Sequence, residues 1–379
     1  MVKGLDAYKQ SMVKFHAAVP DLHFEIDDQI AQGDQVVARW TLRGTQRGEL
    51  QGHAATGKSF EISGVSTFRI AEGKIQEIWA SMDRLGMQQQ LGWRSAQTKH
   101  DIHDPEVARK LFDSWKAPFP PFRILGNVYY VGLSGVSSYL ITTPAGHILM
   151  DTAFDDTVPL LQANIAALGF DWRDIKFILA SHAHVDHTGA HARMKDLTGA
   201  VIVMSEADAA LLARGGREDF SPFPAELLAY RPAQTDRIVC DDDQVTLGGV
   251  TFTAHLTPGH TQGATTWTTR LAEGGRELDV MFFSSLGLVE GTRLRDNSIY
   301  PGIVAGYRES LAKLRKLPCD IFLAPHGEMF GLADKAERLK RGEQPNPFID
   351  TQALSAILAT TERVLAEALG KNSTTKAAR

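Results

Sequence analysis

Residues 182–187 read His182-Ala183-His184-Val185-Asp186-His187, and they directly follow the apolar run Phe177-Ile178-Leu179-Ala180. The hexapeptide concentrates four metal-ligand side chains in six residues. Because alternate residues of an extended segment share a face, His182 and His184 can point to one place where the strand ends, and Asp186 and His187 follow at the turn into a helix. The stretch therefore predicts a hydrolase-type metal centre at a strand end that can serve two metals.

Imidazole and carboxylate ligands without thiolates suit zinc, with iron and manganese as weaker alternatives, and a catalytic zinc takes about three protein ligands. Two further histidines follow apolar, strand-like runs at sharp turns: His260 in Thr257-Pro258-Gly259-His260-Thr261-Gln262-Gly263, and His326 in Leu323-Ala324-Pro325-His326-Gly327. The alternative, solvated loop histidines, fits poorly with the density of the hexapeptide. We predict two zinc ions per chain, one held by His182, His184 and His260 and the other by Asp186, His187 and His326.

The composition describes ordinary soluble globular material. The chain has 379 residues, 43% of them hydrophobic and 22% charged, which predicts two domains. A net charge of -5, without a Lys/Arg block, gives no reason to expect nucleic acid or a membrane as partner. The start of the chain lacks the apolar core of a signal peptide, which predicts a cytoplasmic protein, or a periplasmic one if an upstream signal was removed.

The hydrophobic pattern divides the chain into four segments. Residues 1–92 predict a helix and a curved antiparallel sheet, from the alternation in 35–43 and 59–62 and the hairpin-turn dipeptide Glu72-Gly73. Residues 93–121 predict a linker that contains a short helix near 104–115 and ends in a proline-rich breaker. Residues 122–370 alternate strands and helices, and residues 371–379 predict a flexible tail.

Residues 120–369 resemble the metallo-β-lactamase superfamily, whose fold is a four-layer αβ/βα sandwich with metals at the sheet edges. The histidine motif is its signature, and the runs 129–132, 137–143, 164–170 and 181–189 agree with it. The segment is most similar to the subclass B3 metallo-β-lactamases, which use a histidine, here His187, where other subclasses rely on a cysteine. The resemblance implies β-lactam hydrolysis, and hence antibiotic resistance, by a hydroxide bridging two zinc ions about 3.5 to 4 Å apart.

The resemblance also assigns roles beside the metals. Asp151 matches an acidic position that orients metal-bound histidines by hydrogen bonding, although a helix N-cap is equally compatible with its sequence context. Lactonases and glyoxalase II usually present a metal-bridging aspartate after the strand that here ends in Ser284-Ser285. In subclass B3 a serine there holds a water on the second metal or contacts the substrate carboxylate. The resemblance assigns this role to Ser285, with Ser284 as the weaker candidate. Plain turn-forming serines are the alternative. We expect Asp186 to help relay the proton.

The cysteines depart from the family pattern. Cys319 resembles one half of the fold's usual carboxy-terminal disulfide, but no cysteine follows it. The other cysteine, Cys240, lies far away without CxxC spacing. We therefore expect two free thiols, as is usual in a reducing compartment.

The amino-terminal segment resembles the SnoaL-like polyketide cyclase (ester cyclase) family, a cone-shaped α+β barrel, through residues 19–24, 33–39 and 68–75. The family's first helix has no counterpart, and its usual Glu-His-Trp reads Glu77-Ile78-Trp79. Asp83 takes the place of the family's acid/base aspartate and is the candidate pocket residue. Without the histidine, the resemblance implies a binding or dimerising role over catalysis, and so a possible homodimer through this domain.

Three functions compete. The first is a subclass B3 metallo-β-lactamase acting on a small-molecule β-lactam. The second is a lactonase or thioester/ester hydrolase of a cellular metabolite, which the missing bridging carboxylate disfavours and the missing export signal favours. The third, which is not enzymatic, makes the amino-terminal domain an assembly module that pairs chains.

Overall fold

The computed structural model describes residues 5–50, 52–93 and 102–374. The chain divides into two compact units, residues 1–100 and 101–379. The helix α3 (Pro105–Trp115), in the segment predicted as a linker, belongs to the second unit because Phe112 packs against Leu133 and Phe154 there. The segment that joins the units is therefore shorter than the sequence suggested.

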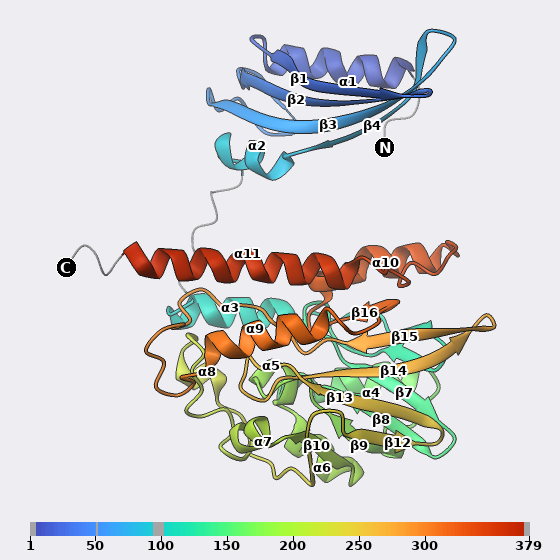
Figure 1. The fold of residues 1–379 in the computed structure, drawn as a ribbon, viewed down its shortest axis with the longest axis vertical. Coiled ribbons are helices and arrows are strands. Elements are labelled where there is room, and N and C mark those ends of the chain that lie inside the picture. Colours follow the sequence, from blue (N-terminus) through green and yellow to red (C-terminus); the bar gives the residue numbers. More distant parts are fainter. Residues whose placement is uncertain (1–4, 51, 94–101, 375–379) are drawn as a thin grey trace. The chain divides into compact units, whose positions relative to one another are not determined.

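The first unit is a four-stranded antiparallel sheet with two helices (Figure 1). Its strands run in the order β1-β2-β3-β4, and Glu72 and Gly73 form the last hairpin turn, both with positive φ (54° and 72°). Trp40, Leu42 and Ile62 line the core between the sheet and the helices. The elements are α1 (Leu5–Ala18), β1 (His23–Gln32), β2 (Gln35–Thr45), β3 (Ser59–Ala71), β4 (Lys74–Met82) and α2 (Arg84–Gln90).

The second unit contains two sheets. The seven-stranded sheet has the order β11-β10-β9-β8-β7-β6-β5, and the five-stranded sheet has the order β12-β13-β14-β15-β16. The first comprises β5 (Phe122–Leu125), β6 (Val128–Tyr130), β7 (Tyr139–Thr143), β8 (Gly146–Met150), β9 (Ile175–Leu179), β10 (Val201–Ser205) and β11 (Arg237–Val239). The second comprises β12 (Gln244–Leu247), β13 (Val250–Leu256), β14 (Thr265–Glu273), β15 (Arg276–Phe282) and β16 (Ile321–Leu323).

Helices of the second unit pack against both sheets. Side chains of α4, α6 and α7 join one buried cluster with Leu149 and Ile178, whereas α9 and α11 join the cluster that fills the space between the sheets, with Met150 and Leu179. Neighbouring residues of one strand thus face different layers, as the twofold repeat of a strand requires. The helices are α4 (Val158–Ala167), α5 (Val185–Thr188), α6 (His191–Thr198), α7 (Glu206–Ala213), α8 (Ala225–Leu228), α9 (Ile303–Leu314), α10 (Leu332–Lys340) and α11 (Ala353–Thr374).

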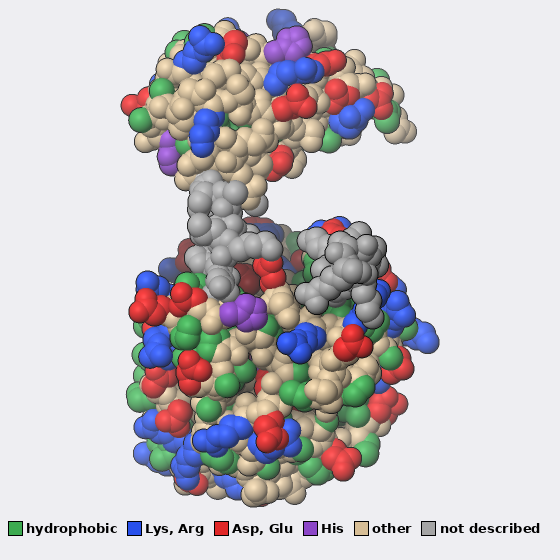
Figure 2. Space-filling view, turned by 90° about the vertical axis from the view of Figure 1, so that its left-hand side faces the viewer, with side chains coloured by type: hydrophobic (Ala, Val, Ile, Leu, Met, Phe, Trp, Pro, Cys, Tyr) green, Lys and Arg blue, Asp and Glu red, His purple; other side chains and the backbone are tan. Residues whose placement is uncertain are grey.

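This arrangement is the predicted αβ/βα sandwich preceded by a small α+β unit. One boundary differs from the prediction, because α11 continues to Thr374, so that residues 371–374 of the expected flexible tail are helical. Residues 375–379 lie outside the described part. On the face of the second unit in Figure 2, acidic and basic side chains are interspersed. Within the described ranges no helix has the length and apolar character needed to cross a bilayer.

Parallel strand pairs bring the predicted site to one edge. Strands β8 and β9 are parallel, with Met150 opposite Leu179, and β15 and β16 are parallel, with Phe282 opposite Leu323. The loops that follow these four strands contain Asp151, the hexapeptide, Ser285 and His326. Because the carboxyl ends of parallel strands meet at the same edge, segments far apart in the sequence converge there.

Candidate metal centre

The six predicted ligands lie together. The rings of His182, His184 and His260 surround one point, with centroids 4.7–4.8 Å apart in each pair. The ring centroid of His187 lies 4.2 Å from that of His182, and the Asp186 carboxylate lies 3.1 Å from Nε2 of His187 and 3.4 Å from Nε2 of His326. The structure thus brings together both predicted trios, and they are adjacent.

Hydrogen bonds on the outward side of the rings hold three of these histidines. Nδ1 of His260 donates to the carbonyl of Gly287 (2.6 Å), and Nδ1 of His326 donates to the carbonyl of Gly135 (3.0 Å). Nδ1 of His182 lies 3.1 Å from the Ser181 hydroxyl. With Nδ1 engaged, each ring presents Nε2 to the cluster, which is how a protein fixes the tautomer of a metal-binding histidine.

Asp151 supports the second trio. Its carboxylate accepts hydrogen bonds from the backbone N–H (2.7 Å) and the hydroxyl (2.6 Å) of Ser181, and it lies 3.2 Å from Nδ1 of His187. The residue adopts a left-handed backbone conformation, with φ of 58°. The following 3₁₀ turn begins after Phe154 and has no side-chain cap, so the Asp151 carboxylate faces the histidines and does not cap that turn.

Burial and neighbouring charges shift the pKa values of these histidines in different directions. Burial lowers the pKa of His260 to about 3 and that of His326 to about 4, which keeps both rings neutral at pH 7. Burial also acts on His187, but the negative charges of Asp186 and Asp151 outweigh it and raise the pKa of that ring to about 10. The charge of His187 in turn holds the pKa of Asp186 below its usual value, despite burial.

The buried nitrogen and oxygen atoms of the cluster are the kind of donors that two metal ions would bind. Nε2 of His182 is buried and makes no hydrogen bond to the described part of the protein, and the buried ring nitrogens of His187 have only the carboxylates of Asp151 and Asp186 close to them there. Buried polar atoms normally find partners, so the free nitrogen of His182 beside these carboxylates requires an explanation. Five imidazoles and one carboxylate, with no thiolate, are a donor set that suits two zinc ions.

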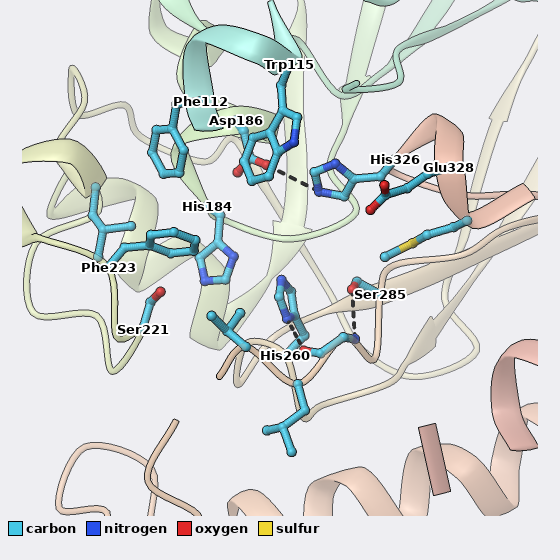
Figure 3. A pocket seen from close by; sticks show the side chains of 15 residues that line it. Phe112, Trp115, His184, Asp186, Ser221, Phe223, His260, Ser285, His326 and Glu328 are labelled. Atoms are coloured by element: carbon cyan, nitrogen blue, oxygen red, sulfur yellow. Dashed lines mark hydrogen bonds and ion pairs between the residues drawn. The ribbon is translucent and has the colours of Figure 1, made fainter. Parts of the chain in front are cut away.

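A pocket of about 200 Å³ opens onto the cluster (Figure 3). Phe112 and Trp115 of α3 form one wall, and Trp115 packs edge-on against His326 with ring centroids 5.0 Å apart. Sequence reasoning placed this helix but missed that it lines the site, because only the tertiary fold brings α3 there. The remaining lining residues are His184, Asp186, Ser221, Phe223, Leu228, His260, Ser285, Gly287, Leu288, Val289, His326, Glu328 and Met329.

The structure separates the two candidate serines. Ser285 lines the pocket, and its hydroxyl accepts a hydrogen bond from the N–H of Gly287 (3.0 Å). Its φ of 113° is a conformation that side-chain-bearing residues rarely adopt, and strain of this kind accumulates at functional sites. The hydroxyl of Ser284 instead contacts the buried hydroxyls of Thr257 (2.7 Å) and Thr266 (3.2 Å).

Asp83 lies in the first unit, where it has a structural contact. Its carboxylate accepts a hydrogen bond from the N–H of Gly86 (2.7 Å) and caps α2. The side chain is exposed at the sheet edge. Its predicted part in a pocket stays a prediction.

Two buried carboxylates near the centre were missed at the level of sequence. Asp208 accepts hydrogen bonds from the N–H of Ala183, the hydroxyl of Thr261 and the N–H of Gly263, each 2.9 Å long. It thereby joins the hexapeptide to the loop that contains His260. Asp219 lies 3.0 Å from His184. Neither aspartate stands near the motif in sequence, so no spacing pattern could have indicated them.

Comparison with known proteins identifies the family of each unit. The family described as "Metallo-beta-lactamase superfamily" matches residues 131–326, and the family described as "SnoaL-like polyketide cyclase" matches residues 2–91. The fold and site thus define a metallo-hydrolase. The chain belongs to the metallo-β-lactamase superfamily, with a SnoaL-like amino-terminal domain, as the sequence predicted.

Solved structures of metallo-β-lactamases resemble most of the chain. The native FEZ-1 metallo-β-lactamase from Legionella gormanii is 38% identical, with a TM-score of 0.66 over 68% of this chain and 98% of that one. BJP-1, a subclass B3 metallo-β-lactamase of Bradyrhizobium japonicum, is 41% identical, with a TM-score of 0.65 over 69% of this chain and 97% of that one.

Curated relatives point to another activity. An N-acyl homoserine lactonase, AttM of Agrobacterium fabrum, is 32% identical over 164 residues, which are 36% of this chain. The match spans 60% of that lactonase's length. The superfamily and its metal-dependent hydrolytic chemistry are therefore common to both groups of relatives, and they differ in substrate.

Proposed function

We propose that the protein is a zinc-dependent hydrolase of the subclass B3 metallo-β-lactamase type, which opens the amide of a β-lactam. The observation that carries this proposal is the ligand set itself: His187 takes the place that other lactamase subclasses give to a cysteine, and Ser285 stands where lactonases usually have a carboxylate. The identities of 38% and 41% to two solved metallo-β-lactamases, the second of subclass B3, support it.

The residues would hold two zinc ions, one on His182, His184 and His260 and the other on Asp186, His187 and His326. Bound there, the ions would supply a water-derived nucleophile at neutral pH and polarise the amide carbonyl. Hydrolysis adds the water oxygen to the carbonyl carbon, breaks the carbon–nitrogen bond and delivers one proton to the nitrogen.

The chain's own side chains would guide this reaction. Asp186 is buried next to the pocket, where its carboxylate oxygen can accept a proton and pass it toward the departing nitrogen. The Ser285 hydroxyl faces the same pocket and can donate a hydrogen bond to a substrate carboxylate. Phe112, Trp115 and Phe223 form an apolar wall that excludes water from the bound substrate.

A second candidate is a lactonase or ester hydrolase of a cellular metabolite. The match to N-acyl homoserine lactonases favours it. The pocket composition favours it too: Glu328 lies at the wall beside His326, and the described lining residues include no Lys or Arg side chain that could bind a substrate carboxylate (Figure 3). The missing bridging carboxylate argues against it.

Substrate turnover separates the two candidates. The zinc-loaded protein is assayed with penicillins, cephalosporins and carbapenems beside homoserine lactones and thioesters, and expressed in a susceptible bacterium to measure β-lactam resistance. We expect the largest kcat/KM on a β-lactam. Intact lactams together with rapid lactone turnover would refute the first proposal and support the second.

We further propose that the first unit pairs two chains. Strand register places Ile30, Val37, Thr67 and Trp79 in one row across all four strands, and three of them are large apolar residues with 67%, 38% and 53% of their surface exposed. Exposed apolar rows of this kind favour association. Deleting the residues before Trp93 should yield an active monomer, and an unchanged dimer would contradict this proposal.

A further inference from the structure

A carboxylate lies against the first trio as Asp151 lies against the second. Oδ2 of Asp219 is 3.0 Å from Nε2 of His184, and the two side chains are almost entirely buried, with 3% and 9% of their surface exposed. Burial lowers the pKa of His184, but the charge and hydrogen bond of Asp219, together with the charges of Asp186 and Asp208, outweigh burial and raise that pKa. The pair is therefore a buried electrostatic contact.

A turn with several positive φ angles, between α7 and Asp219, positions Asp219 next to His184. Helix α7 ends at Ala213 and is followed by Gly215-Gly216, whose φ values are 63° and 73°, and Glu218 also has a positive φ of 63°. A Cβ on Gly216 would lie 2.2 Å from the carbonyl oxygen of Leu228, so only glycine fits there. Asp219 follows this turn directly, and its carboxylate reaches His184.

The same loop is anchored to the hexapeptide at a second point. The Tyr230 hydroxyl donates to the carbonyl of Ala183 (2.7 Å), and the N–H of Tyr230 donates to the carbonyl of Gly215 (3.0 Å). Asp219 is therefore held in place relative to the backbone that carries His184. Ser221 and Phe223, which line the pocket, belong to this loop as well.

The contact decides which ring nitrogen of His184 is available. Nε2 faces the carboxylate, which leaves Nδ1 as the nitrogen that can serve a metal. A carboxylate next to the outer nitrogen keeps the proton there, fixes the ring orientation and makes the inner nitrogen a stronger ligand. His182, His260 and His326 have only a hydroxyl or a backbone carbonyl in this position. Each trio thus contains one histidine backed by a carboxylate: His187 by Asp151, and His184 by Asp219.

We propose that Asp219 is a positioning residue, which orients His184 and strengthens it as a ligand in the trio of His182, His184 and His260. The role rests on the proposed zinc centre. Asp219 also connects that trio to the pocket wall, because its loop continues directly into Ser221 and Phe223.

The test measures zinc affinity in the full-length protein with variants Asp219→Ala and Asp219→Asn. A chromophoric chelator competes for the metal, so the result does not depend on any substrate, and cobalt(II) substitution reports ligand geometry by absorption. Loss of the carboxylate should weaken one of the two zinc equivalents about 10- to 100-fold. The amide of Asp219→Asn keeps an oxygen that accepts a hydrogen bond from Nε2–H, so this variant should regain part of the affinity.

Glu226→Ala is the matched control, since Glu226 is an exposed carboxylate on the same stretch of chain. It should bind zinc like the unchanged protein. If the unchanged protein binds two zinc ions and Asp219→Ala binds both within twofold of it, the role of Asp219 is overturned while the proposed function stands. If the unchanged protein binds no zinc, the proposed function itself fails. Equal losses in Asp219→Asn and Asp219→Ala, with weakened folding of both, would indicate a merely structural role and also contradict the inference.

Discussion

The two units use sheets in opposite ways. In the second unit the two sheets enclose a large buried core, and the strand ends hold a cluster of buried histidines and aspartates. In the first unit β1 and β4 are exposed along their whole length, and large apolar side chains such as Ile30 and Trp79 face outward. A closed double-sheet frame can desolvate and orient ionisable groups, whereas an open sheet offers a surface. This difference supports a catalytic role for the second unit and an association role for the first.

Metal removal should abolish the activity of the second unit and leave the association through the first unit intact, which is the largest expected difference between them. Dialysis against a strong chelator should abolish hydrolysis, because the ligand cluster is the source of the nucleophile, and it should leave the oligomeric state unchanged. Activity assays and light scattering on the same sample check both expectations. Zinc should restore the activity. Hydrolysis that persists in chelated, metal-free protein would contradict the assignment of metal-dependent chemistry to the second unit.

Asp186→Asn should be the most damaging substitution outside the histidines. The amide cannot accept a proton and is a poor metal ligand, so kcat should fall about 10²- to 10⁴-fold, the usual contribution of a general acid–base group. Steady-state kinetics and metal analysis measure the loss. Asp196→Asn, an exposed aspartate on α6, is the control and should leave kcat unchanged.

Trp79→Glu should separate association from catalysis. A carboxylate in the apolar row across β1–β4 would lie unpaired in a buried interface, so the protein should become monomeric while kcat per chain stays the same. Light scattering coupled to size-exclusion chromatography gives the mass. Lys74→Glu, at the hairpin end of β4, also introduces a carboxylate, with an even larger change in charge, away from the row and should keep the assembly.

The metal-free centre should lose stability at alkaline pH. The pKa of His187 rises from 6.5 to about 10 in the folded protein, so the stabilisation that it brings is complete below pH 6.5 and disappears as the pH passes through 10. The Tm of the metal-free protein should therefore fall between pH 6.5 and 10, and His187→Gln should make this fall smaller. Zinc-loaded protein should lack it, because the metal replaces the proton. A flat Tm profile of the metal-free protein would contradict the assignment.

Ser285→Gly should give the smallest effect on stability and a modest one on catalysis. Glycine adopts a φ of 113° without strain, so the free energy of unfolding should rise by about 1 kcal/mol, the relief of strain less the greater chain entropy. The lost hydroxyl should lower kcat/KM about tenfold. Ser285→Ala should show the same kinetic loss without the gain in stability, and equal stability of both variants would argue against strain.

The sequence predicted the folds and the candidate ligands that the structure brings together, but not the pocket. The hexapeptide is a local pattern, so its candidate ligands could be recognised directly, and the sandwich and cone folds followed from family resemblance. Phe112, Trp115, Asp208 and Asp219 act through contacts with residues distant in sequence, and no period or spacing marks such contacts. The choice between Ser284 and Ser285 depends on a positive φ after β15, which a strand pattern does not reveal.

The central claim is that six residues from three loops hold two metals. Zinc stoichiometry, measured by mass spectrometry on dialysed protein, tests it most directly. We predict two tightly bound zinc ions per chain in the unchanged protein and one in each of His260→Ala and His326→Ala. Full retention of two zinc ions by either variant, or fewer than one ion in the unchanged protein, would contradict the account.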